Sequence, residues 1–238
     1  MVMADRQASR MRRSTTADEI KQLILARNLK SGDSLPTETE LCETLGVSRS
    51  SVREAIRTLS TLDIVDVRHG HGTYVGAMSL DPMVEALVFR GVLSPSGTLD
   101  ALREVIDVRL ALDLAMAEVV VANVSNADVE ELRGRVAEMV HKAARGETFL
   151  EADRAFHTAL FAATGNRLAQ QLVGAFWDVH TAVIPLLGLA VPADIEDTAK
   201  AHGDMLSAAL AGDTEAYRRA VIEHYLPLQR SLAAAGAT

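Results

Sequence analysis

Residues 37–61 have the sequence "TETELCETLGVSRSSVREAIRTLST", which decides the fold of the first third of the chain. Thr37 followed three residues later by Glu40 predicts a capping box, in which each side chain satisfies a free backbone N–H at a helix start. Gly46 predicts the end of this short helix, because glycine adopts the left-handed conformation at a helix C-terminus. Ser48 predicts the start of a second helix, whose apolar positions are Val52, Ala55, Ile56 and Leu59. Two short helices joined by a glycine-containing turn are typical of a helix-turn-helix.

The second helix also carries a line of arginines away from its apolar face. Arg49, Arg53 and Arg57 are spaced i, i+4 and i+8, so they share one face. In helix-turn-helix proteins the first residues of this helix meet base edges in the major groove, where Arg binds guanine and Ser binds phosphate or base. Taken alone, three arginines also fit an ordinary solvated helix face. The neighbouring cap, turn and hairpin favour DNA binding.

The segment "IVDVRHGHGTYV", residues 64–75, predicts a β-hairpin directly after the second helix. Two β-branched runs, 64–67 and 73–75, flank a turn that is rich in Gly and His. Arg68, His69 and His71 would let this hairpin contact a flanking groove or the DNA backbone.

Residues 16–76 resemble the winged helix-turn-helix of the GntR family of bacterial transcription regulators. The match is carried by "LPTETELCETLGVSRSSVREAIRTLSTLDIVDVRHGHGTYV". Asp63 stands where relatives often have glycine, and Asp tolerates the left-handed region better than most residues. Thr39 stands where many relatives have a DNA-contacting arginine. The resemblance implies that double-stranded DNA is contacted by Ser48, Arg49, Ser50, Arg53, His69 and Gly70.

The chain beyond residue 76 is helical and acidic. Residues 1–76 hold eleven Lys or Arg against ten Asp or Glu, whereas the rest holds thirteen against twenty-two. Apolar periodicity predicts helices over 81–91, 98–122, 126–144, 147–164, 166–188, 193–211 and 213–234. We therefore predict a mainly α protein. It has a disordered tail over 1–15, a winged helix-turn-helix over 16–77 and an all-helical bundle over 78–238.

The polar N-terminus and the absence of long apolar runs predict a cytoplasmic protein without a membrane span. Cys42 is the only cysteine in the chain, so no internal disulfide can form.

Four side chains of the helical region have the spacing of a metal site. Asp153 and His157 are one turn apart in "EADRAFHTALF", and a carboxylate with an imidazole suits a divalent ion. His202 and His224 are equidistant from the "AGD" break near residue 213, so a helical hairpin would bring them level. Each histidine alone also fits a core or surface position. His141 is expected on the surface, and His180 fits either a core or a cavity wall.

Residues 99–232 resemble the all-helical effector-binding domain of the FadR subfamily, often called FCD. "REVIDVRLALDLA", "EADRAFHTALFAATGNRLA" and "AHGDMLSAALAGDTEAYRRAVIEHY" carry this resemblance. Metal-binding members use an Asp, a His one turn later and two further His, which fall on Asp153, His157, His202 and His224. The family's arginine for the effector carboxylate falls on Arg109.

These features predict a homodimeric transcription regulator or repressor rather than an enzyme. The N-terminal domain would bind a palindromic operator, and a small carboxylate would modulate binding at a divalent metal, with Zn or Ni favoured. One alternative is a regulator whose metal is purely structural. The other is a metal-dependent hydrolase, since a metal with open positions can activate water.

Overall fold

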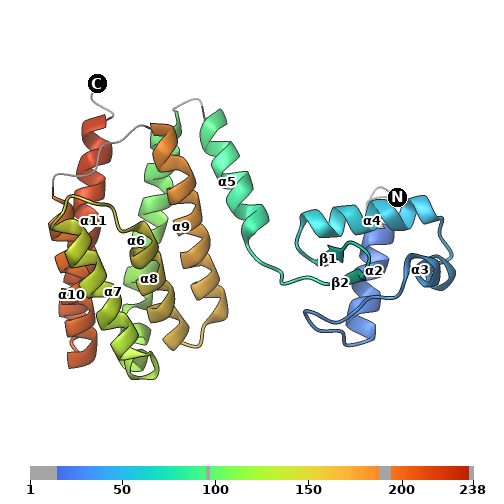
Figure 1. Cartoon of the computed structure of the whole chain (residues 1–238), viewed down its shortest axis with the longest axis horizontal. Helices are drawn as coiled ribbons and strands as arrows, with labels where there is room; N and C mark the ends of the chain where they lie inside the picture. The colour runs from blue at the N-terminus through green and yellow to red at the C-terminus, as the bar shows by residue number, and fades with distance from the viewer. Residues whose placement is uncertain (1–14, 95–96, 188–193, 236–238) are drawn as a thin grey trace, which may run out of the picture. The chain divides into compact units, whose positions relative to one another are not determined.

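The computed structural model describes residues 15–94, 97–187 and 194–235, and the chain divides into two compact units at Pro82 and Met83 (Figure 1). Residues 1–14 of the predicted disordered tail lie outside the described residues. The mainly α fold with a small β-hairpin is confirmed. Among the described residues, no helix is long and apolar enough to cross a membrane.

The first unit packs three helices, α2 (Thr16–Ala26), α3 (Glu38–Leu45) and α4 (Arg49–Thr61), around a small apolar core. The capping box of α3 is present, since Thr37 accepts from the backbone N–H of Glu40 and Glu40 accepts from that of Thr37. Gly46 ends α3 at a φ of +67°, and Ser48 caps α4 by accepting from Ser51. The predicted helix-turn-helix is therefore confirmed.

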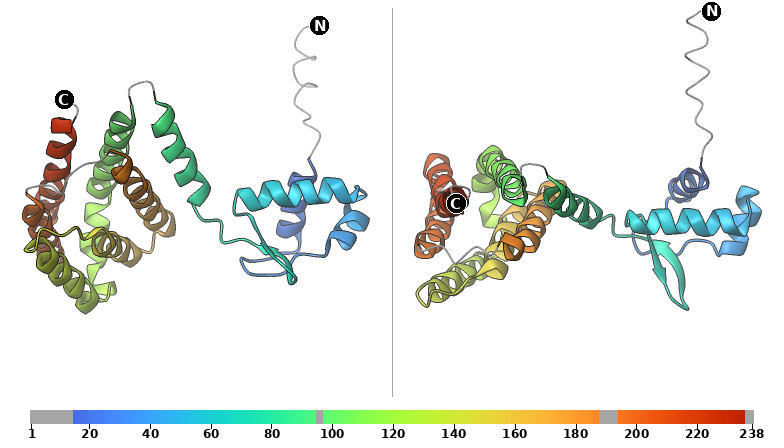
Figure 2. Two further views of the ribbon diagram at one scale, coloured as in Figure 1. Left: turned by 45° about the horizontal axis from the view of Figure 1, so that its top comes forward. Right: turned by 90° about the horizontal axis from the view of Figure 1, so that it is seen from above.

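The hairpin consists of β1 (Val65–Arg68) and β2 (Gly72–Val75), antiparallel with Val65 opposite Val75. It projects from the helices of its own unit (Figure 2). Backbone hydrogen bonds also join β2 to the segment before α3, with a bridge between Ser34 and Tyr74. The sequence did not predict this third segment.

Asp63 and Gly76 fix the base of the hairpin. Asp63 has a φ of +53°, so its left-handed conformation is confirmed. Its carboxylate accepts a 2.7 Å hydrogen bond from the backbone N–H of Ser79, which glycine could not do. A Cβ at Gly76 would lie 2.2 Å from the carbonyl oxygen of Asp63, so this position requires glycine.

The second unit is a bundle of α-helices with a short 3-10 turn, η1 (Val124–Asn126). Its helices are α5 (Asp81–Leu93, which begins just before the division), α6 (Thr98–Asn123), α7 (Val129–Ala143), α8 (Leu150–Ala163), α9 (Arg167–Leu187), α10 (Ile195–Ala211) and α11 (Thr214–Ala235). The predicted helices agree with these to within a few residues. The predicted helix over 126–144 starts later, because η1 ends at Asn126 and Asp128 caps α7.

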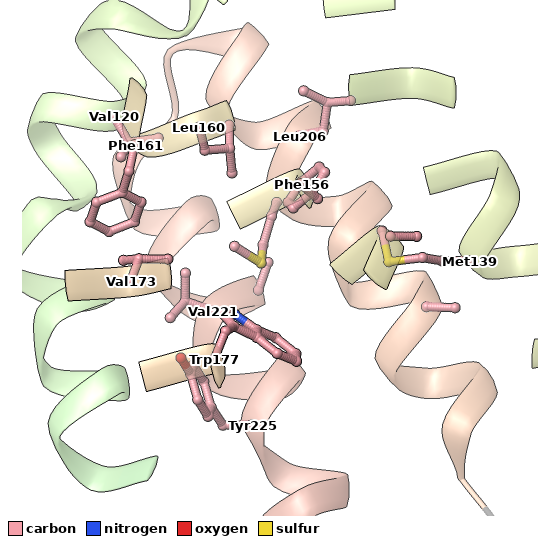
Figure 3. Close-up of a cluster of buried hydrophobic side chains, with 14 of the residues drawn as sticks. Val120, Met139, Phe156, Leu160, Phe161, Val173, Trp177, Leu206, Val221 and Tyr225 are labelled. Carbon is pink, nitrogen blue, oxygen red and sulfur yellow. The ribbon is translucent and has the colours of Figure 1, made fainter. Parts of the chain in front are cut away.

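The core of this unit is aliphatic and aromatic. Phe156, Phe161, Trp177 and Tyr225 are almost completely buried, and Figure 3 shows Trp177 beside Tyr225 within this cluster. The α10–α11 hairpin turns at Gly212, which has a φ of +72°. This turn brings the inner faces of α10 and α11 together against α6. Polar side chains on those faces are consequently buried.

Candidate functional site

Asp153 and His157 on α8, His202 on α10 and His224 on α11 converge inside the second unit. One potential ligand atom from each side chain lies within 4.8 Å of all the others, and all four residues are buried. The ring centroids of His202 and His224 are 4.4 Å apart, as expected for a hairpin turning near residue 213. A bound transition metal lies about 2 Å from each ligand, so these separations need little contraction to hold one ion.

The hydrogen bonds of His202 show which of its nitrogens faces the cluster with a lone pair. Nδ1 lies 2.7 Å from the carbonyl oxygen of Thr198, which can only accept, so Nδ1 carries a proton. In the neutral ring Nε2 is then an unprotonated acceptor, yet it lies 2.9 Å from Oδ1 of Asp153. Two acceptors in contact require a second proton on His202, a proton on Asp153 or a cation between them. A backbone carbonyl on the far nitrogen is the usual arrangement of a metal-bound histidine.

The electrostatics keep the other groups in the protonation states that bind metals. Burial raises the pKa of Asp153, but attraction to His202 and the close approach of His157 and His202 outweigh it and hold the pKa well below its usual range. Burial lowers the pKa of His224 well below its usual value, and the neighbouring His202 acts in the same direction. A carboxylate and a neutral imidazole are the forms that coordinate metals.

Two buried nitrogens of the cluster lack a hydrogen-bond partner among the described residues. They are Nε2 of His157, which lies 3.3 Å from Asp153, and Nδ1 of His224. Leaving a buried polar atom without a partner costs about 1–3 kcal/mol. A cation in the centre would give both nitrogens a partner, so the donor set fits a divalent metal.

A cavity of about 140 Å³ adjoins this cluster. Asp153 and His224 form part of its wall together with Arg109, Trp177 and His180. The guanidinium of Arg109 lies 4.1 Å from the centroid of the Trp177 ring and donates to Nδ1 of His180 over 2.9 Å. Among the described residues, no carboxylate forms an ion pair with Arg109, so this buried cation is available to an anion in the cavity.

The remaining polar residues lie elsewhere. His141 is exposed on α7 and contacts Arg145, outside the cluster. Asn166 accepts from the backbone N–H of Ala169 and so caps the start of α9. Cys42 is half-buried against the core of the first unit, and its thiol is free.

In the first unit, the predicted DNA-contacting residues all lie on the surface. Ser48, Arg49, Ser50 and Arg53 are exposed at the start of α4, on a different face from its buried positions. Nε of Arg53 forms a 2.9 Å ion pair with Glu38 of α3. The exposed start of α4 therefore presents an arginine that is already paired with a carboxylate.

The hairpin brings a second set of polar groups to the surface. His69 and Gly70 are exposed in the turn between β1 and β2, where Gly70 has a φ of +79°. Arg68 is ion-paired with Asp66 at 2.8 Å, and its guanidinium covers the ring of Tyr74. These contacts give the base of the turn a fixed shape.

Comparison with known proteins assigns each unit to a known domain family. Residues 12–75 match the model for bacterial regulatory proteins of the gntR family, and residues 104–226 match the FCD domain. The chain belongs to the GntR family. It is a DNA-binding transcription regulator whose C-terminal FCD domain is the effector domain.

Relatives of this GntR-family regulator are also regulators by name. The HTH-type transcriptional regulator LutR of Bacillus subtilis (strain 168) is 32% identical over 151 residues, which cover 63% of this chain and 67% of LutR. The galactonate operon transcriptional repressor of Escherichia coli (strain K12) is 25% identical over 202 residues, 85% of this chain and 88% of the repressor. The solved structure of Streptococcus agalactiae GntR has 28% identity and a TM-score of 0.69, covering 91% of this chain and 98% of that one.

FCD domains are associated with metal binding, and this one contains a buried Asp and three His that could hold a metal. Sequence reasoning missed Trp177 as a wall of the cavity and left His180 undecided. The spacing of His180 three residues after Trp177, on one face of α9, was the available signal. It also missed Glu38, for which the sequence held no signal.

Proposed function

We propose that this GntR-family regulator binds a palindromic operator as a homodimer and that a small carboxylate modulates this binding at a metal centre. The metal is held by Asp153, His157, His202 and His224. Arg109 pairs with the carboxylate. The observation that carries the proposal is a four-residue donor set beside a cavity with a buried arginine that forms no ion pair among the described residues.

The donor set favours zinc or nickel. Imidazole and carboxylate ligands suit both ions, whereas a harder ion such as Ca²⁺ prefers oxygen ligands alone. Two orphaned imidazole nitrogens and the lone pair of His202 all gain a partner from such an ion. When bound, the metal supplies a positive centre with open coordination positions for an anion.

Arg109 supplies the second contact for a carboxylate. Its charge is buried, and its hydrogen-bond partner His180 is a neutral ring rather than an anion. A buried charge without a counter-ion is costly, so an anionic ligand in this cavity relieves that cost. An effector carboxylate is therefore favoured over a neutral or cationic ligand.

A purely structural metal explains the donor set but leaves Arg109 and the cavity without a purpose. A hydrolase is disfavoured because the named relatives are regulators. A carboxylate effector that binds the metal and Arg109 together would explain the donor set, the cavity and the buried arginine.

Dimerisation follows from the way a helix-turn-helix reads DNA. One recognition helix covers a short half-site, and two-fold symmetry supplies the second half of a palindrome. Phe89, Val92 and Leu93 of α5 are more than half exposed, which fits a surface that an assembly covers.

The test combines metal analysis with operator binding. Native mass spectrometry of the purified protein should find one divalent metal per chain. Its operator affinity, measured with a DNA fragment selected from random sequence, should change when small carboxylates are added. Metal-free protein whose operator binding still responds to carboxylates would refute the coupling between the metal and the effector. Metal-loaded protein whose operator binding responds to no carboxylate would indicate that the metal is purely structural.

A further inference from the structure

The effector cavity has a polar end and an apolar remainder. The ring of Tyr225 lies 4.8 Å from that of His224 and 5.5 Å from the guanidinium of Arg109, which donates to His180, so the polar groups lie around one region of the cavity wall. Asp153 belongs to the same cluster as His224. The rest of the wall is largely aliphatic and aromatic, with Phe149, Leu150, Ile184, Ile195 and Leu228. A ligand whose carboxylate meets Arg109 must therefore place its other atoms against hydrocarbon.

A second carboxylate would find no cation in the apolar part. Among the described residues of the wall, Arg109 is the one Lys or Arg side chain. Burying an unpaired carboxylate costs several kcal/mol. Away from Arg109 and the metal cluster, the wall thus disfavours the second carboxylate of a dicarboxylate or tricarboxylate.

Several hydroxyls on a ligand would also lack partners. The donors of two hydroxyls in the wall are already engaged, because Tyr225 donates to Asp113 over 2.6 Å and Ser231 donates to the carbonyl oxygen of Pro227. The free donors that remain are the hydroxyls of Thr148 and Thr198 and Nε1 of Trp177, which has no hydrogen-bond partner among the described residues. A sugar acid such as gluconate carries more hydroxyls than these three donors can satisfy, and each unpaired one weakens binding.

The cavity volume limits the length of the ligand. A cavity of about 140 Å³ is close to the volume that holds benzene in other proteins, which has about six non-hydrogen atoms. Butyrate has that size.

We propose that the cavity selects a short aliphatic monocarboxylate of about six to eight non-hydrogen atoms. The carboxylate pairs with Arg109, and the hydrocarbon part packs on Ile184, Ile195 and Leu228. This inference rests on the carboxylate-binding role proposed above and adds the class of acid.

Trp177 provides the readout, because it is the only tryptophan in the chain and its ring faces Arg109. Metal-loaded full-length protein is titrated with acetate, propionate, butyrate and pentanoate, and the emission of Trp177 is followed with calorimetry in parallel. Each added methylene should tighten binding about fourfold until the cavity is filled. Succinate and gluconate should bind at least tenfold more weakly than butyrate.

Two variants test the apolar wall. Ile184→Ser and Leu228→Ser should each weaken butyrate binding several-fold while leaving acetate binding unchanged. Leu168→Ser, at an exposed position on α9, should change neither.

The outcomes separate this inference from the proposed function. If succinate or gluconate binds as tightly as butyrate, the aliphatic selectivity is wrong and a carboxylate effector still stands. If affinity does not rise along the series from acetate, the apolar wall does not contact the ligand and the inference is also wrong. If no carboxylate binds, both the inference and the proposed effector class fail.

Discussion

Nη1 of Arg109 donates a 2.9 Å hydrogen bond to Nδ1 of His180, and only 4% of each residue is exposed. Arginine has no acceptor, so Nδ1 of His180 must be unprotonated and the ring neutral. Burial lowers the pKa of His180 to about 3, and the charge of Arg109 acts in the same direction. The pair therefore keeps a single positive charge, that of Arg109, in the cavity wall at all physiological pH values.

This arrangement predicts that Arg109→Ala loses the effector response but keeps the metal. Arg109 touches none of the four metal-binding candidates through a hydrogen bond or ion pair among the described residues. Removing a charge-assisted contact to a carboxylate costs about 1.5–3 kcal/mol, so butyrate should bind at least tenfold more weakly. Fluorescence titration of the metal-loaded variant measures this loss.

Arg109→Lys serves as the control for charge. It retains a cation but not the two-pronged geometry of a guanidinium, so an intermediate affinity is expected. Equal effector affinity in wild type and Arg109→Ala would show that the carboxylate is bound elsewhere.

The buried imidazoles predict a stability that falls with acid. His180 has a pKa of about 3 in the folded protein, and burial also lowers that of His224, whereas an unfolded imidazole titrates near 6.5. Below pH about 6.5 the unfolded chain binds more protons, so the free energy of unfolding decreases towards lower pH. His180 alone should contribute up to about 1.4 kcal/mol per pH unit between its two pKa values.

Urea unfolding of the metal-free protein between pH 7.5 and 5 measures this slope. His180→Gln should make it shallower, because the substituted side chain does not titrate. A wild-type protein whose stability is constant over this range would contradict the neutral, buried state of the two imidazoles.

The metal-site proposal predicts that each ligand substitution releases the ion. Asp153→Asn, His157→Ala, His202→Ala and His224→Ala should each reduce metal content strongly. His141→Ala should not, since His141 is exposed on α7. Elemental analysis gives the stoichiometry, and thermal unfolding gives a second readout. An ion that binds only the folded state raises the melting temperature of wild type and of His141→Ala, but not of the ligand variants.

A contrary result would be full metal content in all four ligand variants. The hydrogen bonds of Asp153 would then be those of a satisfied polar core. Loss of metal should also become steeper as the pH falls through the imidazole range, because protons compete for the same nitrogens.

Much of the bundle and its donor set follows from local rules. An Asp and a His one turn apart share a helix face whatever the helix packs against. His202 and His224 are placed by a hairpin whose turn needs only Gly212. Spacing along the helices therefore predicted each pair, whereas bringing α8 against the α10–α11 hairpin depends on the packing of the bundle.

The cavity could not be predicted in the same way. Its wall depends on how α9 is rotated against α6, which puts Trp177 and His180 on Arg109. Leucine-rich helices accept several rotations, and only the packing of the whole core selects one. The pairing of Arg53 with Glu38 is likewise set by the angle between α3 and α4.

The exposed apolar side chains of α5 predict a dimer. Sedimentation velocity at micromolar concentration should give twice the chain mass of 25.6 kDa. Phe89→Asp should shift the protein towards monomer, because the charge would be buried in the interface. Leu168→Asp, at a similarly exposed position, is the matched control and should remain dimeric. A monomeric wild type with full operator affinity would refute the two-fold mode of DNA reading.

Because Arg53 forms an ion pair with Glu38, the role of α4 in DNA binding can be tested by substitutions that should weaken operator binding and by one that should strengthen it. Arg49→Ala and Arg53→Ala should each weaken operator binding by about 1–3 kcal/mol and relax the preference at one base position. Glu38→Gln should strengthen binding, since Arg53 no longer has to leave a carboxylate before it contacts DNA. The gain should be less than about fivefold, because an ion pair this exposed is weak.

Fluorescence anisotropy at fixed salt measures all three affinities, and repeating it at high salt should shrink the gain from Glu38→Gln. Arg133→Ala, in the second unit, is the control and should bind the operator like wild type. Unchanged affinity in both arginine variants would remove the start of α4 from the DNA interface. A Glu38→Gln variant that binds more weakly would show instead that Glu38 positions Arg53 for DNA, so that the ion pair assists recognition and does not oppose it.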